Sequence, residues 1–231
     1  MRRTLTLLVL LPLCPAALCL LVPAVPAAAH EEPPETPGPP GEAAAGLDCD
    51  RGRAGIYPCH EVDLLAFVPR DELGLGAVDT LNDVWGWTDP QTGTPYALVG
   101  ASVGTVFVSL ADPHRPQVLG ILPTRSLAAP WRDVKVHAGH AIVVADVAGH
   151  GLQVFDLARL RGVSSPRTWQ ADVAYSGPGF GALGGFALGN AHNVAVNEET
   201  GFAYAVGSST CGRRGSASAT NTVPTEVPTR A

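Results

Sequence analysis

Apolar and polar positions between residues 47 and 211 alternate in short runs that are typical of β-strands. The runs at 94–100, 140–146 and 201–207 read "TPYALVG", "HAIVVAD" and "GFAYAVG" and are rich in aliphatic and β-branched residues. They are too short and too closely bounded by glycine for helices. The turns before the first and third runs end with Gly93 and Gly201, where a positive φ costs little. The pattern therefore predicts a series of β-hairpins.

Three segments, which begin at residues 82, 132 and 192, share one arrangement. Each opens with a polar pair, continues with a valine and then forms a hairpin; the valines are Val84, Val134 and Val194. Their spacings of 50 and 60 residues fall in the range of propeller blades. The runs "TVFVSL", "LQVFDL" and "RPQVLGIL" add further strands, up to four per segment. We therefore predict an all-β fold, an incomplete β-propeller of about two and a half four-stranded antiparallel blades.

The N-terminal residues have the layout of an export signal. Arg2 and Arg3 precede an apolar run over residues 5–25, and small alanines follow. This predicts a signal peptide over residues 1–29 and an extracytoplasmic location: secreted, periplasmic or at the cell surface. A membrane-spanning helix is the alternative, since the run is nearly long enough; its prolines and Ala-x-Ala ending favour cleavage, after which the protein would not be integral to the membrane.

Composition divides the rest of the chain into three parts. Residues 30–46 are rich in Pro, Glu and Gly and predict a surface linker. Residues 47–211 are the size of one folded domain. Residues 212–231 carry few sizeable apolar side chains and predict a disordered tail without a C-terminal anchor. The net charge of −6 and the lack of a basic stripe give no footprint for nucleic acid.

The cysteines predict one local disulfide. An exported chain keeps Cys49, Cys59 and Cys211 after signal cleavage. Oxidising conditions favour a bond between Cys49 and Cys59, which lie close in sequence. Cys211 is then a free thiol, an intermolecular partner, or one half of a bond to a cysteine outside this chain.

Six stretches resemble one known family. They read "YPCHEVDLLAFVP", "NDVWGWTDPQTGTPYALVG", "GTVFVSLADPHRPQVLG", "WRDVKVHAGHAIVVAD", "GLQVFDLARL" and "AHNVAVNEETGFAYAVG". In this order they look like the choice-of-anchor B family, whose propeller-like domains carry LVIVD repeats. The resemblance covers roughly residues 49–211 and implies an exported bacterial protein with no established enzymatic activity. Members of that family continue through further repeats, so the resemblance also implies truncation or a frameshift after Cys211.

The polar pairs are the strongest candidates for a binding site. In a propeller the first strand of each blade lines a central channel, so equivalent positions converge. The predicted ring consists of Asn82, Asp83, Arg132, Asp133, His192 and Asn193. Such a ring could hold an anion, a sugar or peptide group, or Ca²⁺ through Asp83 and Asp133. The structural alternative is that Arg132 pairs with neighbouring carboxylates while the other side chains bond to backbone and lock blade to blade.

Other chemical motifs are less specific. "GASVG" matches a nucleophile elbow around Ser102, but strand-like residues follow it where a helix is needed. His137, His140 and His150 lack nearby carboxylate or cysteine ligands at metal-site spacing, which favours solvent-facing turn histidines. The tryptophans are candidates either for stacking on a carbohydrate or, with better support, for burial between blades; they are Trp85, Trp87, Trp131 and Trp169.

Two function classes follow from these features. The first is a non-catalytic exported propeller that binds a protein, a glycan, or a small ligand or ion at the channel mouth. The second is a propeller-type hydrolase or metal-dependent phosphoesterase in which Asp83, Asp133 and His192 act. Because an incomplete propeller cannot close, we also expect open strand edges, near residues 203–207 and at the opposite end, through which chains self-associate.

Overall fold

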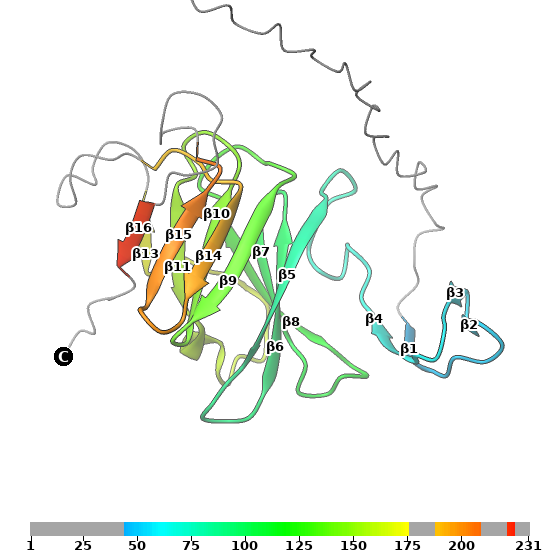
Figure 1. Cartoon of the computed structure of the whole chain (residues 1–231). Helices are drawn as coiled ribbons and strands as arrows, with labels where there is room; N and C mark the ends of the chain where they lie inside the picture. Colours follow the sequence, from blue (N-terminus) through cyan, green and yellow to red (C-terminus); the bar gives the residue numbers. More distant parts are fainter. Residues whose placement is uncertain (1–43, 176–187, 209–220, 225–231) are drawn as a thin grey trace, which may run out of the picture. The chain divides into compact units, whose positions relative to one another are not determined.

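The computed structural model describes residues 44–175, 188–208 and 221–224 (Figure 1). These residues form mainly β-strands and turns, in several small sheets that are almost wholly antiparallel, which confirms the all-β prediction. The predicted signal peptide and Cys211 lie outside the described residues. Within the described ranges, no helix has the length and apolar character needed to cross a bilayer.

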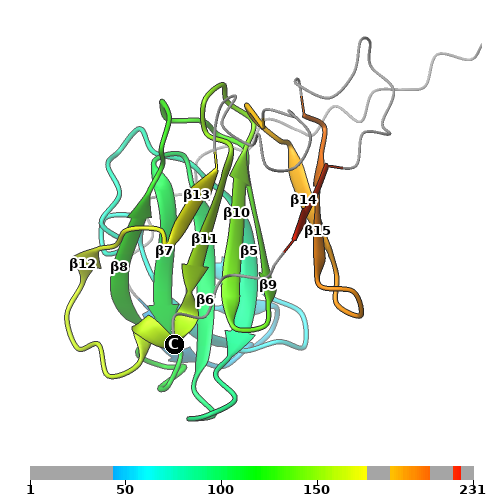
Figure 2. The ribbon, with the colours of Figure 1, turned by 90° about the vertical axis from the view of Figure 1, so that its left-hand side faces the viewer.

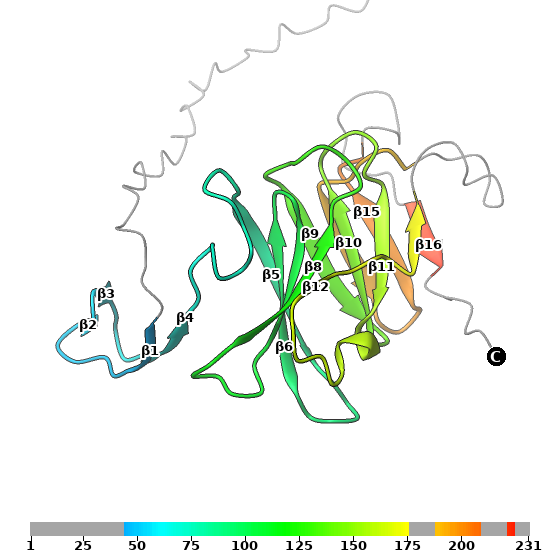
Figure 3. The same cartoon turned by 180° about the vertical axis from the view of Figure 1, so that it is seen from behind.

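Sheet I has the strand order β12-β8-β7-β6-β5. Its strands are β5 (Leu81–Thr88), β6 (Pro95–Ala101), β7 (Gly104–Ser109), β8 (Gln117–Pro123) and β12 (Arg167–Thr168). β12 joins β8 in parallel, whereas all other pairs are antiparallel (Figure 3). Gly93 has a φ of 71° and ends the turn before β6, as predicted. Ser102 lies in the tight turn between β6 and β7, so "GASVG" forms a hairpin and not a nucleophile elbow.

Sheet II has the order β13-β11-β10-β9 and follows directly in the chain. Its strands are β9 (Arg132–His137), β10 (His140–Ala145), β11 (Leu152–Asp156) and β13 (Val173–Tyr175). A single 3₁₀ turn, η1 (Leu157–Leu160), follows β11, and the Asp156 carboxylate caps it by accepting from the Ala158 N–H at 2.9 Å. Ala138 and Gly139 both have positive φ and make the predicted turn between the two histidines His137 and His140.

Sheet III has the order β14-β15-β16. Its strands are β14 (Asn193–Asn197), β15 (Phe202–Val206) and β16 (Asn221–Pro224). Gly201, with a φ of 70°, ends the predicted turn between β14 and β15. β16 falls within the tail that the sequence predicted to be disordered, and it pairs with β15. β15 therefore has a neighbour on both sides over residues 202–205, so the expectation of an open edge is wrong for residues 203–205; residues 206 and 207 lie beyond the pairing with β16.

The N-terminal described segment forms two small hairpin-like pairs. β1 (Ala44–Leu47) pairs with β4 (Leu64–Phe67), and β2 (Arg53–Ala54) pairs with β3 (Tyr57–Pro58). β1 begins inside the predicted linker, so ordered backbone starts a few residues earlier than composition suggested. Cys49 and Cys59 form a disulfide, which confirms the predicted pair.

The main core lies between sheets I and II. Phe107 of β7 stacks on Phe155 of β11 with ring centroids 4.7 Å apart, and Trp169 contacts both rings edge-on. The Trp169 indole N–H donates to the Leu119 carbonyl at 3.1 Å, which satisfies its one polar atom. The other buried members of this cluster are Tyr96, Leu98, Leu119, Leu122, Val134, Ala141, Val143, Leu157 and Leu160.

A second core lies between sheets II and III, so sheet II is covered on both faces. Along β10, Ala141 and Val143 belong to the first core, whereas Ile142 and Val144 belong to the second. Successive strand residues point to opposite faces. A strand buried on both faces therefore reads as the continuous apolar run "AIVVA" rather than as an alternation. Figure 2 shows sheet III beside sheet II.

The first strands of the three sheets lie next to one another. β5, β9 and β14 are each the end strand of their sheet, and β9 contacts both of the others (Figure 1). This arrangement brings together the polar pairs that open the three segments, although those pairs are 50 to 60 residues apart in sequence.

Candidate functional site

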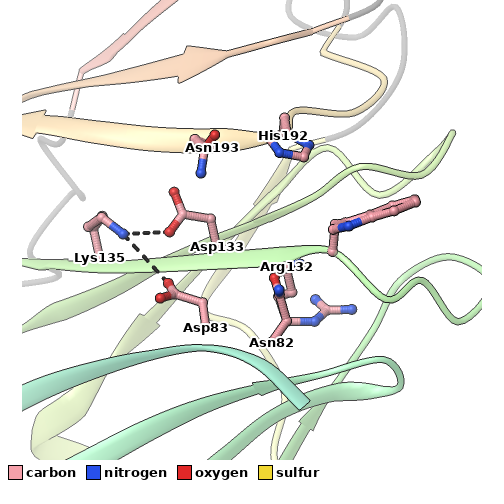
Figure 4. Close-up of a pocket in the computed structure, with 8 residues that line it drawn as sticks. Asn82, Asp83, Arg132, Asp133, Lys135, His192 and Asn193 are labelled. Atoms are coloured by element: carbon pink, nitrogen blue, oxygen red, sulfur yellow. Dashed lines mark hydrogen bonds and ion pairs between the residues drawn. The ribbon is translucent and has the colours of Figure 1, made fainter. Parts of the chain in front are cut away.

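A pocket of about 330 Å³ opens where the three first strands meet (Figure 4). All six polar residues of the predicted ring line it, together with Trp131, one of the candidate stacking residues, and Lys135, which the sequence analysis did not identify. The lining residues are Asn82, Asp83, Trp131, Arg132, Asp133, Lys135, His192 and Asn193. The volume is at the lower end of the range for small-molecule sites.

Two of the carboxylates fasten one sheet to the next. The Asp83 carboxylate accepts the Val134 N–H at 2.9 Å, and the Asp133 carboxylate accepts the Val194 N–H at 2.6 Å. The Asn82 side-chain oxygen accepts the Arg132 N–H at 3.0 Å in the same way. An end strand presents backbone N–H groups with no strand to receive them, and these side chains supply the missing acceptors. Asn82, Asp83 and Asp133 therefore have the structural role that the sequence analysis offered as the alternative to ligand binding: they bond to backbone groups and hold one sheet against the next.

Lys135 lies between the two carboxylates (Figure 4). Its ammonium donates to Asp133 and is 3.5 Å from the Asp83 carboxylate. It also donates to the Val134 carbonyl at 3.1 Å and lies 4.4 Å from the centre of the Trp85 ring. Lys135 follows Asp133 by two positions along β9, so the two side chains share a face; that spacing was the signal that sequence reasoning missed.

The two aspartates respond differently to this environment. Burial, and next the Asp133 carboxyl, raise the pKa of Asp83 above its ordinary value. Burial also acts to raise the pKa of Asp133, but hydrogen bonds with Asp83, Lys135 and the Val194 N–H outweigh it and lower that pKa. A proton entering the pair therefore goes first to Asp83, and Asp133 stays ionised beside Lys135.

The geometry does not favour Ca²⁺ between Asp83 and Asp133. The ammonium of Lys135 occupies the space between their carboxylates, and each carboxylate also bonds a backbone N–H. Ca²⁺ takes six to eight oxygen ligands. In the part of the chain that the structure describes, no group of three or more His, Cys, Asp or Glu side chains could hold a metal ion.

The guanidinium of Arg132 points away from the pocket, into the interface of sheets I and II. Its Nε donates to the Ala101 carbonyl at 2.8 Å, and its Nη1 donates to Nε2 of His150 at 2.9 Å. Its Nη2 has no hydrogen-bond partner among the described residues. The prediction that Arg132 pairs with neighbouring carboxylates is therefore wrong; Arg132 lies on the same face of β9 as Val134, which directs it inward.

His150 is also buried, which corrects the expectation of a solvent-facing turn histidine. Burial, assisted by the charge of Arg132, lowers the pKa of His150 to about 4, and burial lowers the pKa of Arg132 to about 10. A neutral imidazole can accept the Arg132 N–H at Nε2 while its Nδ1 faces the Gly151 carbonyl at 3.2 Å.

His192 is oriented by a carboxylate that sequence reasoning did not identify. Its Nδ1 donates to Asp146 at 3.0 Å, and the other oxygen of Asp146 accepts from the Asn190 amide at 2.6 Å. Asp146 follows β10 directly, and its own N–H donates to the Trp131 carbonyl at 3.2 Å. This fixes the tautomer and leaves Nε2 of the exposed His192 as an acceptor at the pocket.

The tryptophans divide between the two predicted roles. Trp169 is buried between sheets I and II, and Trp87 is half-buried and stacks on Tyr96 with centroids 5.3 Å apart. Trp85 and Trp131 are exposed, and Trp131 lines the pocket. Trp87 and Trp169 therefore contribute to packing, as the burial alternative expected. Trp85 and Trp131 have accessible rings, and Trp131 is the one of these two that lines the pocket.

Besides the charged Lys135, Asp83 and Asp133, the pocket contains three polar groups for which the described residues provide no hydrogen bond. They are the Nδ2 of Asn82, the Asn193 amide and Nε2 of His192, and the Trp131 ring lies beside them. Within the described residues, the Asn193 side chain makes no hydrogen bond. The arrangement can donate and accept hydrogen bonds and offer an aromatic face. No family model, curated protein or solved structure matches the chain.

Proposed function

We propose that the protein is an exported, non-catalytic β-propeller repeat protein that binds a small neutral polar ligand, of the saccharide class, in the pocket between β5, β9 and β14. The propeller part of the proposal is supported by three sheets built from aligned segments with their first strands side by side. It is supported also by the resemblance of the sequence to the choice-of-anchor B family.

One observation carries the proposed binding role. Six polar positions from three segments distant in sequence converge on one pocket, and only some of them are used for holding the sheets together. The groups left over are amides, an imidazole and an indole. Polar groups at a concave surface that bond to no other part of the fold are candidates for ligand contact.

The charge balance of the site favours a neutral ligand. Lys135 offsets much of the charge of Asp83 and Asp133, and the guanidinium of Arg132 is buried elsewhere. An anion would meet two carboxylates, whereas a cation would have to displace Lys135. A sugar hydroxyl both donates and accepts hydrogen bonds, as do the amides, and a sugar ring can lie on the face of Trp131.

Titration calorimetry against a panel of neutral mono- and disaccharides tests this proposal. We expect binding in the range of about 1 mM or tighter. The variants Trp131→Ala and Asn193→Ala should each weaken it at least tenfold, whereas Leu127→Ala, at an exposed apolar residue outside the pocket, should not. Absence of heat from the intact protein across the panel, or equal affinity in all variants, contradicts the proposal.

A hydrolase is the second candidate, and the Asp146–His192 pair is the observation that favours it. A carboxylate that holds Nδ1–H makes Nε2 of a histidine a better general base. Asp83 and Asp133, the other residues suggested from sequence, are occupied by backbone N–H groups and Lys135. Turnover of an ester or phosphoester panel that His192→Ala abolishes and Asp146→Asn reduces would support this candidate; an inactive intact protein excludes it for those substrates.

A further inference from the structure

The three aligned valines have the same place in their sheets but not the same burial. Val134 of β9 is 0% exposed and packs against sheet I, and Val194 of β14 is 1% exposed and packs against sheet II. Val84 of β5 is 59% exposed. The first two valines are covered by the sheet that precedes them in the chain, and no described sheet covers the third.

The side-chain acceptors are left open at the other end of the series. Asp83 accepts from Val134, and Asp133 accepts from Val194. Asn193 holds the corresponding position in β14, and its side-chain oxygen accepts no hydrogen bond from the described residues. No described side chain accepts the N–H of Val84 either. The same side-chain to backbone hydrogen bond thus occurs twice in the chain. The acceptor for a third such bond is at Asn193 and the donor is at Val84, but these two belong to opposite ends of the series.

The outer face of sheet III has the composition of a covered surface. Along β15, Ala203 and Ala205 face sheet II and are buried. The larger side chains point the other way: Phe202 is 38% exposed, Val206 is 40% exposed, and Tyr204 between them is half-buried. Strand residues on an exposed face are usually polar. A contiguous apolar face of this kind marks a contact surface.

We propose that a second copy of this chain covers these faces, with β14 and β15 of one copy packed beside β5 of the other. Because Asn193 pairs with Val206 in sheet III, Val84 of the second copy would then be buried against Val206 and Tyr204, and the Asn193 oxygen would accept the Val84 N–H. A second copy is the occupant because the contact continues an interface that the chain already forms twice, and because one chain supplies both complementary halves. The contact uses the Asn193 oxygen and leaves its Nδ2 to the pocket, so the proposal does not depend on the ligand bound there.

The existing cover on sheet I limits where the partner docks. Leu73 and Leu75 are buried against Val106 and Val108 on the same face of sheet I as Val84. The partner therefore contacts β5, the strand that these leucines leave open. The interface joins two different surfaces and is heterologous, so copies add head to tail, in a closed ring or in longer chains.

Sedimentation velocity over a range of protein concentrations tests the proposal with two charged variants. Val84→Glu blocks the β5 side, and Val206→Glu blocks the β15 face; both residues are exposed, so circular dichroism should show folded proteins. We expect the wild type to self-associate reversibly and each variant to dissociate at least tenfold more readily. Leu127→Glu, at an exposed residue that belongs to neither strand of the proposed contact, should associate as the wild type does.

Mixing the two variants separates a head-to-tail contact from other modes. Each variant keeps one intact half, so an equimolar mixture should form a heterodimer that neither variant forms alone. Asn193→Ala should weaken association of the wild type without changing its fold. A wild type that stays monomeric at about 100 µM, well above typical specific affinities, overturns the proposal. So does a mixture without heterodimer, which would indicate a symmetric contact or pairing of strand edges.

Discussion

Sheets II and III carry similar central strands in different surroundings. β10 reads "HAIVVA" and β15 reads "FAYAV", both nearly continuous apolar runs. β10 is buried on both faces, between sheets I and III, whereas β15 is buried on one face and open on the other. A continuous apolar run is typical of a strand covered on both faces, and β15 carries such a run although one of its faces is open, which is why we propose a second copy as its cover.

The largest expected difference in unfolding free energy is between a residue in the core of sheets I and II and a residue on the open face of β15. Phe155→Ala removes a ring stacked on Phe107 in the core and should lower the free energy of unfolding by about 3–5 kcal/mol. Phe202→Ala removes a partly exposed ring and should cost less than about 1 kcal/mol in dilute protein, where copies are separate. Urea unfolding of both variants measures the difference; equal losses would mean that the two faces are covered alike.

A pH effect of intermediate size belongs to the closed interface. The unfolded chain takes up a proton on His150 near pH 6.5, but the folded chain does so only near pH 4. Stability from this group is therefore complete above about pH 6.5 and falls as the pH drops toward 4, by about 3 kcal/mol in all.

Replacement of His150 tests the origin of that slope. His150→Gln keeps an acceptor for Arg132 and should flatten the dependence of unfolding free energy on pH across the window. His140→Gln, at the first residue of β10, is the matched control and should keep the wild-type slope. An unchanged slope in His150→Gln would assign the acid sensitivity to other groups.

The smallest effects concern the side chains that fasten one sheet to the next. Asp133→Ala leaves the buried Val194 N–H without an acceptor and should cost about 1–3 kcal/mol. Asp83→Ala, at a more exposed carboxylate, should cost less. Asn193→Ala should change stability by less than about 0.5 kcal/mol, because the described residues give it no bond to lose. Thermal unfolding of the three variants would contradict this ranking if Asn193→Ala were the most harmful.

Much of the local structure could be predicted from the chain. The strands β6, β10 and β15 follow from apolar runs bounded by turns, and Gly93 and Gly201 adopt the positive φ that the turns require. β16 could not be predicted, because four residues in a tail of low hydrophobicity carry no periodic signal. Its pairing with β15 depends on backbone hydrogen bonds, whose groups every residue except proline carries in full.

The sequence predicted which polar residues lie together in the candidate site, but not the hydrogen bonds and ion pairs that they make. The shared pattern of the three segments placed the polar pairs together, and the pocket contains all six of those residues. The pattern did not reveal that Lys135 would lie between Asp83 and Asp133, or that Asp146 would hold His192. Both depend on which side chains two different strands bring within hydrogen-bond distance.

The sequence by itself determined the class of fold, the turns, the Cys49–Cys59 pair and the six polar ring residues that line the pocket. Those features depend on local periodicity and on spacing along the chain. Only the tertiary structure shows that Arg132 points inward to His150, and that Asp83 and Asp133 accept hydrogen bonds from backbone N–H groups. It also shows that one face of β15 is open. These outcomes are set by contacts between residues that lie 18 to 61 positions apart, and local periodicity does not say which of them meet.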